Sequence, residues 1–385
     1  MVVALAVVAV LMVWPLTNIF TASVIDNRSG ALTLGNFAQV LGHPAYQGAT
    51  INSLIVGAGG MLGATLLGIP LAMLTTRFVI AGRDFVATLA VLALVSPPFI
   101  GAYAWIMMLG ANGWMRALLA DVGIELPPIY GMFGILLVFS LKFYPFVFLL
   151  TASGLGAISP SVEEAAENLG AGPWRRFFKI TLPLIFPAVS SGALLAFVLS
   201  IADFGTPSIV GGRVRLLATT AFDLFTAEMG GNPGLASATS VVLITISMAV
   251  VVLQRWAVRR RDIAGSLLRR QSRKRLKPLA SAAAHFVCYA IVLAGSLPSL
   301  VIVFTSFRKT NGPVFHPGFS LDSYARILGE VPHVIANSFT FATAAVVLIV
   351  ILGTLIGYIL ARRDTLAVGA RSTACCWFPT SFRAW

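Results

Sequence analysis

Charged side chains are scarce in this sequence. Asp, Glu, Lys and Arg make up 11% of its 385 residues, hydrophobic residues make up 58%, and the mean hydropathy is +0.90. A water-soluble domain carries about 25% charged residues to cover its surface. The shortage excludes a soluble protein, and it predicts an all-α polytopic membrane protein whose surface contacts the lipid bilayer.

Groups that carry chemistry are also few. Three cysteines form neither a disulfide framework nor a Cys-x-x-Cys pair, and four scattered histidines lack the spacing of metal ligands. No Gly-Lys dipeptide occurs, which excludes a P-loop. We therefore expect no catalytic residue, no cofactor and no metal in this chain. If ATP drives it, another polypeptide binds the ATP.

The net charge of +13 is concentrated in one place. Ten of the 27 Lys and Arg residues lie between Arg255 and Lys277, a stretch between two hydrophobic spans. Such a position indicates a membrane-topology signal rather than a site for RNA. We expect no nucleic-acid partner.

Eight apolar runs are long enough to cross a bilayer as helices. The first shows neither a basic start nor a small-residue cleavage site, so we interpret it as an uncleaved span. With the N-terminus in the cytoplasm, cytoplasmic segments hold 19 Lys and Arg residues and external segments hold 7. This asymmetry favours that orientation, and it places residues 154–183 in the cytoplasm. The predicted spans are 3–22, 53–76, 86–109, 130–153, 184–205, 236–254, 283–304 and 338–361.

Two stretches of the sequence resemble each other. Residues 33–41 (TLGNFAQVL) match residues 320–328 (SLDSYARIL), and each is followed by an Asn-Ser pair that opens a span, at Asn52 and Asn337. Chance alignment of apolar helices is the alternative, but the polar anchors argue against it. The pattern predicts two tandem membrane modules joined by the basic linker.

The second module is expected to be incomplete. Residues 371–385 correspond to the start of a span in the first module, yet they hold two arginines and no long apolar run. A frameshift or a premature stop is the interpretation, with about eight spans of an expected twelve. The predicted domains are 1–49 (first span and external segment), 50–255 (complete module), 256–282 (linker), 283–370 (start of the second module) and 371–385 (aberrant tail).

The cytoplasmic segment 159–183 has a helix–break–helix pattern. Ser159 can cap a first helix that starts at Pro160. Gly170 after Leu169 is typical of a helix stop in the left-handed conformation. Pro173 can open a second helix, and Pro183 is expected to end it before the next span.

One face of the first helix is suited to contact with another protein. Val162, Ala165, Ala166 and Leu169 follow helical spacing, with Glu164 beside them. Small side chains there would let a partner approach closely. A short amphipathic helix lying on the membrane is the alternative.

The loop resembles the EAA loop of binding-protein-dependent ABC importer permeases. The matching positions are Glu164, Ala165, Ala166, Gly170, Ile180, Leu182 and Pro183. The resemblance covers about residues 50–255 and implies the type I ABC importer transmembrane fold, in the bacterial inner membrane. It also implies that the loop docks onto an ABC ATPase homodimer, that a periplasmic substrate-binding protein delivers the cargo, and that transport proceeds by alternating access.

The cargo is open at this level. The stretch from Ile201 to Pro207 resembles that of fused two-module permeases for ferric iron, while putrescine, thiamine and phosphonate permeases have similar layouts. A rival from another class is an ion-coupled secondary transporter, which needs no ATPase-docking loop.

Lys142 and Asp203 are charges within predicted spans. Such charges are costly and usually face a cavity or a partner, so both are candidates for the substrate path. Structural roles are the alternative, with Lys142 reaching toward the interface or backbone carbonyls and Asp203 capping a helix end. Counting from the span limits puts their depths roughly 13 Å apart, which argues against a direct pair.

Overall fold

The computed structural model describes residues 10, 13–27, 29–227, 231–259, 275–311 and 314–361. The chain divides into two compact units, one of Ile19–Ser306 and one of Met1–Asn18 with Phe307–Trp385. The middle of the predicted linker and the predicted aberrant tail lie outside the described residues. Residues 3–9, 11 and 12 of the first predicted span also lie outside the described residues, and helix α2 (Trp14–Ser23) is its described α-helix.

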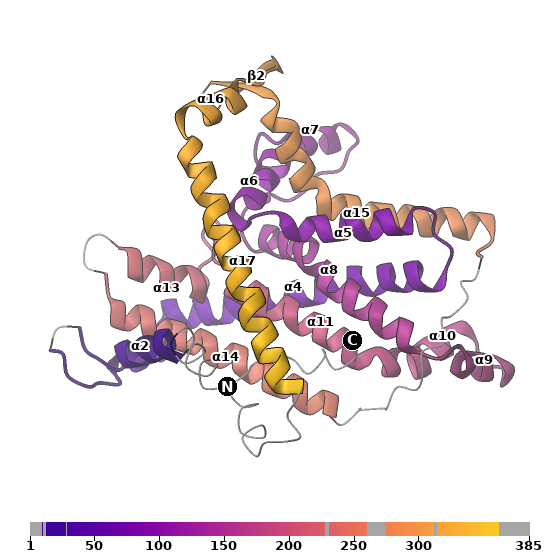
Figure 1. Ribbon diagram of the computed structural model, residues 1–385, viewed down its shortest axis with the longest axis horizontal. Helices are drawn as coiled ribbons and strands as arrows, with labels where there is room; N and C mark the ends of the chain where they lie inside the picture. Colours follow the sequence, from indigo (N-terminus) through magenta and orange to yellow (C-terminus); the bar gives the residue numbers. More distant parts are fainter. Residues whose placement is uncertain are drawn as a thin grey trace. The chain divides into compact units, whose positions relative to one another are not determined.

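Three long helices form the centre of the larger unit (Figure 1): α4 (Pro44–Arg77), α8 (Met132–Ala157) and α11 (Leu182–Ala202). Small residues let them approach closely, because Gly57, Gly60 and Gly68 are buried on α4. A Cβ atom added at Gly68 would lie 2.8 Å from the Cβ atom of Val147 on α8. Close contact through small residues is how helices associate in lipid, where burial of apolar surface gives little drive.

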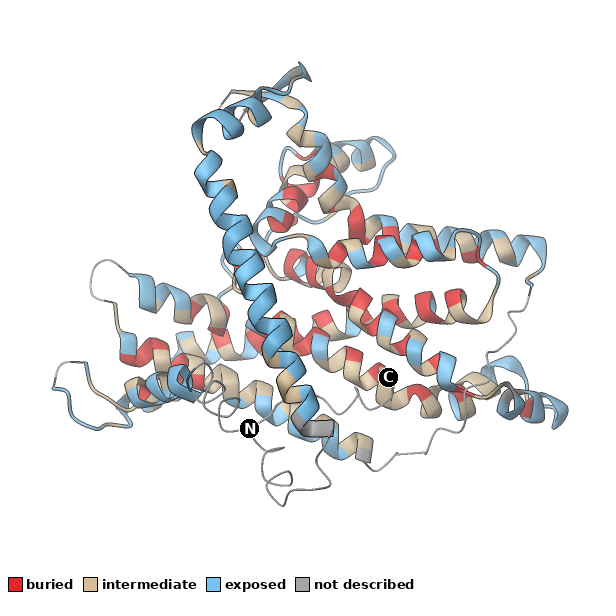
Figure 2. Ribbon diagram, in the orientation of Figure 1, coloured by how far each residue is buried: buried red, intermediate tan, exposed pale blue. Residues whose placement is uncertain are grey.

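The helices of the larger unit bury their facing sides and leave the outer sides exposed (Figure 2). Helix α14 (Pro233–Arg259) packs against α11, and helix α3 (Gly35–Gly42) packs against α14. Two short helices, α12 (Gly205–Val210) and α13 (Leu217–Thr226), connect α11 to α14. The burial pattern is that of a bundle packed from one-sided helices.

The predicted span 86–109 is wrong as a single helix. It consists of α5 (Arg83–Val95) and α6 (Pro98–Leu109), and the chain bends by 105° between the segments Arg83–Val95 and Pro98–Asp121. The residue before a proline is pushed into extended backbone, and here Ser96 and Pro97 both precede one, with ψ angles of 120° and 143°. Helix α7 (Trp114–Asp121) follows α6.

Six described helices are long and apolar enough to cross a membrane, or seven if the bent pair counts as one span. They confirm six of the eight predicted spans. The six run over Pro44–Arg77, Met132–Ala157, Pro173–Ala202, Pro233–Val258, Pro278–Ser306 and Pro332–Tyr358.

Helix α15 (Pro278–Ser306) lies along α5 (Figure 1). The Ser296 hydroxyl donates a hydrogen bond to the carbonyl of Leu89 at 2.8 Å. The Tyr289 hydroxyl donates to the carbonyl of Ala81 at 3.0 Å. The first helix after the basic linker is therefore packed into the larger unit, although the sequence analysis assigns it to the second module.

The smaller unit holds a hairpin that the sequence analysis missed. Strands β1 (Arg308–Asn311) and β2 (Val314–Phe319) pair antiparallel, with Thr310 opposite Phe315. Helices α16 (Asp322–Glu330) and α17 (Pro332–Ala361) follow.

The stretches predicted to be repeats begin alike. Leu34 caps α3 with φ −96° and ψ 6°, and Leu321 caps α16 with φ −99° and ψ 9°. The hydroxyls of Thr33 and Ser320 each accept the backbone N–H two residues on, both at 2.9 Å. The two copies thus share a local geometry as well as a sequence pattern.

Candidate functional site: a helical loop and a buried ion pair

The segment between α8 and α11 is a helix–break–helix, as predicted. Helix α9 (Pro160–Asn168) and helix α10 (Pro173–Arg176) form a projection beyond the ends of α8 and α11 (Figure 1). Ser159 occupies the N-cap position, but its side chain makes no cap hydrogen bond. The Ser159 hydroxyl instead pairs with that of Ser161 at 2.8 Å, so the predicted side-chain cap is wrong.

Gly170 has the left-handed conformation expected of a helix stop, with φ +78°. Its N–H donates to the carbonyl of Glu167 at 3.0 Å, and the N–H of Ala171 donates to the carbonyl of Ala166 at 3.0 Å. The Arg176 guanidinium pairs with the Glu167 carboxylate at 2.5 Å and links the two halves of the loop. Backbone turn and ion pair together fix the angle between α9 and α10.

Pro183 does not end a helix, contrary to the prediction. A π-helical turn, Phe177–Thr181, joins α10 to α11, and Pro183 lies in the first turn of α11. In that turn the N–H of Leu182 donates to the carbonyl of Phe177. A wider turn satisfies backbone groups that proline would otherwise disturb, so residues 173–202 form one candidate span.

The exposed surface of the loop differs in part from the predicted face. Glu164, Ala165 and Leu169 are exposed, but Ala166 is only 6% exposed, and α9 packs chiefly against α10 of the same loop. Ile180, Leu182 and Pro183 are half-buried at the start of the span. These three therefore belong to the base of the loop rather than to its tip.

Two aromatic residues of the loop were missed by the sequence analysis. Trp174 is 75% exposed, Phe178 is 55% exposed, and their rings stack with centroids 6.0 Å apart. Their i, i+4 spacing was the available signal. With Leu169, which is 88% exposed, they give the loop an apolar surface of the kind that marks protein interfaces.

Lys142 and Asp203 form a buried ion pair. The Lys142 Nζ atom lies 2.6 Å from Asp203 Oδ2, and the two side chains are 16% and 7% exposed. Asp203 follows the last residue of α11 and also accepts hydrogen bonds from the backbone N–H of Thr206 at 3.0 Å and from its hydroxyl at 3.1 Å. The expected helix-capping role of Asp203 is confirmed.

The expectation that these two charges lie too far apart is wrong. Helix α8 continues to Ala157, four residues beyond the predicted span. The close approaches of Gly154 to Ala188 and of Gly192 to Val147 place Lys142 at about the level of residues 197–200 on α11. Asp203 is then only about 5–9 Å further along the axis, a gap that the four-carbon stem of lysine spans.

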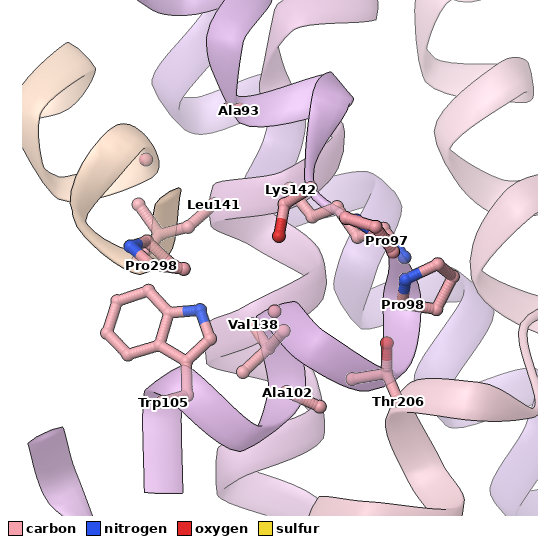
Figure 3. Close-up of a pocket in the computed structure, with 13 residues that line it drawn as sticks. Ala93, Pro97, Pro98, Ala102, Trp105, Val138, Leu141, Lys142, Thr206 and Pro298 are labelled. Atoms are coloured by element: carbon pink, nitrogen blue, oxygen red, sulfur yellow. The ribbon is translucent and has the colours of Figure 1, made fainter. Parts of the chain in front are cut away.

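The ion pair borders a cavity of about 440 Å³ where α5, α6, α8 and α11 meet. A smaller void of about 20 Å³ also touches Lys142. Figure 3 shows Lys142, Pro97 and Pro98 on one side of this void and Trp105 and Pro298 on the other. Within the described ranges no group of three or more His, Cys, Asp or Glu residues could hold a metal ion.

Known proteins match this chain over most of its length. Residues 64–263 match the family described as binding-protein-dependent transport system inner membrane component. A ferric transport system permease protein of Actinobacillus pleuropneumoniae is 26% identical over 369 residues, 91% of this chain and 52% of that protein. A molybdenum transport system permease protein of Escherichia coli K12 is 30% identical over 225 residues, 57% of this chain and 96% of that protein.

Among solved structures, a bacterial alginate ABC transporter in complex with its pentasaccharide-bound periplasmic protein has a chain that superposes with a TM-score of 0.57. The two are 17% identical, and the match covers 69% of this chain and 95% of that one. This likeness shows the fold, which is mostly α-helical and of the type I importer class. The chain spans about half the length of the ferric permease relatives that it matches. With more than half of its residues inside the family match, the chain belongs to the binding-protein-dependent transport system inner membrane components and is a multi-pass inner membrane protein.

Proposed function

We propose that this chain is the permease subunit of an ATP-driven importer, and that it moves a substrate delivered by a periplasmic binding protein across the bacterial inner membrane. ATP hydrolysis is assigned to a separate ABC ATPase homodimer. The observation that carries the proposal is the loop between α8 and α11, which combines the EAA pattern with an exposed apolar tip. The orientation, with the N-terminus and this loop in the cytoplasm, rests on the distribution of Lys and Arg.

The proposed ATPase-docking surface consists of Glu164, Ala165 and Leu169 on α9 with Trp174 and Phe178 beyond the break. Gly170 sets the angle between its two parts. Ala166, being buried, acts by packing the loop on its own chain. Ile180, Leu182 and Pro183 act by joining the loop stiffly to α11, so that a movement of the ATPase is transmitted to the span.

The proposed cargo is ferric iron. Two ferric permease relatives support it, because they align with 91% and 81% of this chain. Molybdenum and 2-aminoethylphosphonate are the alternative cargoes, because other relatives are named for their transport. Lys142 and Asp203 are proposed to border the substrate path, because they lie beside a cavity at a bend between helices.

The two-module organisation is also a proposal. The matching helix caps at Leu34 and Leu321 support it, as does the Pro that starts each following long helix, at Pro44 and Pro332. A second EAA pattern in any frame of the DNA beyond codon 370 would establish it.

The docking surface is tested by Trp174→Ala, with Trp114→Ala as the matched control. Trp114 is 51% exposed on α7, which follows α6 and is remote from α9 and α10 (Figure 1). Central aromatic residues of interfaces cost 2 kcal/mol or more when truncated, so Trp174→Ala should weaken co-purification of the ATPase subunit about thirtyfold. Equal retention of the ATPase by both variants would refute the docking role of Trp174.

A further inference from the structure

We propose that the 440 Å³ cavity beside the ion pair is a cargo subsite for an anionic, oxygen-bearing group, and that Lys142 Nζ is the atom that binds it. The inference rests on the proposed function, because it names the chemical class that the transport path accepts. In the absence of cargo, the Asp203 carboxylate takes the place of the anion and neutralises Lys142.

The hydrogen-bonding capacity of the pair is unequal. Asp203 Oδ1 accepts one donor, the N–H of Thr206, and Oδ2 accepts two, Lys142 Nζ and the Thr206 hydroxyl. A lysine ammonium has three N–H donors, and among the described residues Asp203 is the one hydrogen-bond acceptor recorded for Lys142. The carboxylate is therefore well satisfied, and the spare capacity of the pair lies on the cation.

The Ser96 hydroxyl can also donate a hydrogen bond to an entering group. Ser96 lines both the large cavity and the small void, and its buried hydroxyl has no hydrogen-bond partner among the described residues. The same cavity is lined by Pro98 and Phe99, the first residues of α6. Pro98 has no N–H, so Phe99 is the lining residue that presents a free N–H at the positive end of the helix dipole. Half-helix N-termini at the bilayer midplane bind anionic parts of cargo in other transporters.

A bare metal cation does not fit this site. Its one carboxylate is already occupied, and no cluster of metal-ligating side chains is found where the structure is described. The apolar wall includes Phe99, Phe143 and Phe204, which supply no ligand atoms. Ferric iron would therefore pass this point as an anionic complex, whereas an oxyanion cargo would need no carrier group.

Recognition of the cargo would consist of Lys142 exchanging the Asp203 carboxylate for the entering anion. An entering oxyanion binds Lys142 and Ser96, and Asp203 keeps its two hydrogen bonds to Thr206. Because Thr206 lies on α12, release of Lys142 from Asp203 removes a side-chain link between α8 and the corner between α11 and α12. Cargo binding would thus loosen one link between the spans that line the path.

The test is equilibrium binding of molybdate and of inorganic phosphate to the full chain in lipid nanodiscs. Lys142→Met should weaken the binding at least tenfold, and Lys142→Arg should stay within about threefold of the wild type. Asp203→Asn removes the competing carboxylate and should tighten the binding about tenfold. Unchanged affinity in Lys142→Met overturns the proposal, as does the absence of saturable binding of both anions to Asp203→Asn.

Folding and the broader function need separate readouts. The double variant Lys142→Met/Asp203→Asn removes both charges, so it should fold like the wild type and bind neither anion. ATPase co-purification is measured on the same samples. If the ATPase co-purifies but Lys142→Met binds the anions as tightly as the wild type, the subsite proposal is refuted and the permease proposal stands. If the ATPase does not bind the wild type at all, the permease proposal fails.

Discussion

The buried pair between Lys142 and Asp203 predicts a distinctive stability cycle. The side chains are 16% and 7% exposed, so removal of either partner leaves a largely desolvated charge. Breaking a buried ion pair in this way costs about 3–5 kcal/mol, whereas replacing both charges is often neutral. We expect Lys142→Met to cost about 4 kcal/mol, because the Asp203 carboxylate then keeps only Thr206 as donor.

Asp203→Asn should cost about 3 kcal/mol in free energy of unfolding, the low end of the range for a broken buried ion pair. The reason is that the asparagine carbonyl can still accept a hydrogen bond from the N–H of Thr206. The double variant should fall within about 1 kcal/mol of the wild type. It would then be about 7 kcal/mol more stable than the sum of the two single costs predicts. The free energy of unfolding is measured by denaturant titration in mixed micelles. Additive costs, with the double variant the least stable of the three, would refute a buried and mutually dependent pair.

Two further predictions concern helix contact and orientation. Gly192→Val should cost about 3 kcal/mol or more in the same unfolding assay, because a Cβ there lies 2.7 Å from the Cα atom of Val147, whereas Gly156→Ala, with open space around it, should be tolerated. In a background without the native cysteines, Arg213→Cys should react with a membrane-impermeant thiol reagent in cells whose outer membrane is permeabilised, while Gly172→Cys should not. Labelling of Gly172→Cys alone would reverse the proposed orientation.

Local chemistry made much of the loop predictable. A glycine directly after a leucine at the end of a short helix needs no tertiary information to indicate the left-handed conformation, and Gly170 has it. Pro160 and Pro173 likewise mark the starts of α9 and α10. The burial of Ala166 was not predictable in this way, because it depends on how α9 and α10 fold back on each other across the break.

The site within the membrane was harder to predict. Which residues of α8 and α11 lie at one level depends on the contacts at Gly154 and Gly192. Counting residues from assumed span limits cannot supply that offset, and the depth estimate for Lys142 and Asp203 was wrong for this reason. The bend between α5 and α6 was readable from Pro97 and Pro98, but hydropathy alone favoured a continuous helix.

Docking of the loop between α8 and α11 onto an ATPase is best tested with Gly170→Pro. Proline fixes φ near −65° and has no N–H, whereas Gly170 has φ +78° and donates to the carbonyl of Glu167. The control is Gly172→Ala, because Gly172 has φ −62° and open space around it. The measurement is co-purification of the ATPase subunit from membranes that contain equal amounts of each variant. We expect loss of the ATPase with Gly170→Pro and its retention with Gly172→Ala, with both variants inserted into the membrane like the wild type. Normal co-purification with Gly170→Pro would contradict the docking of this loop onto an ATPase.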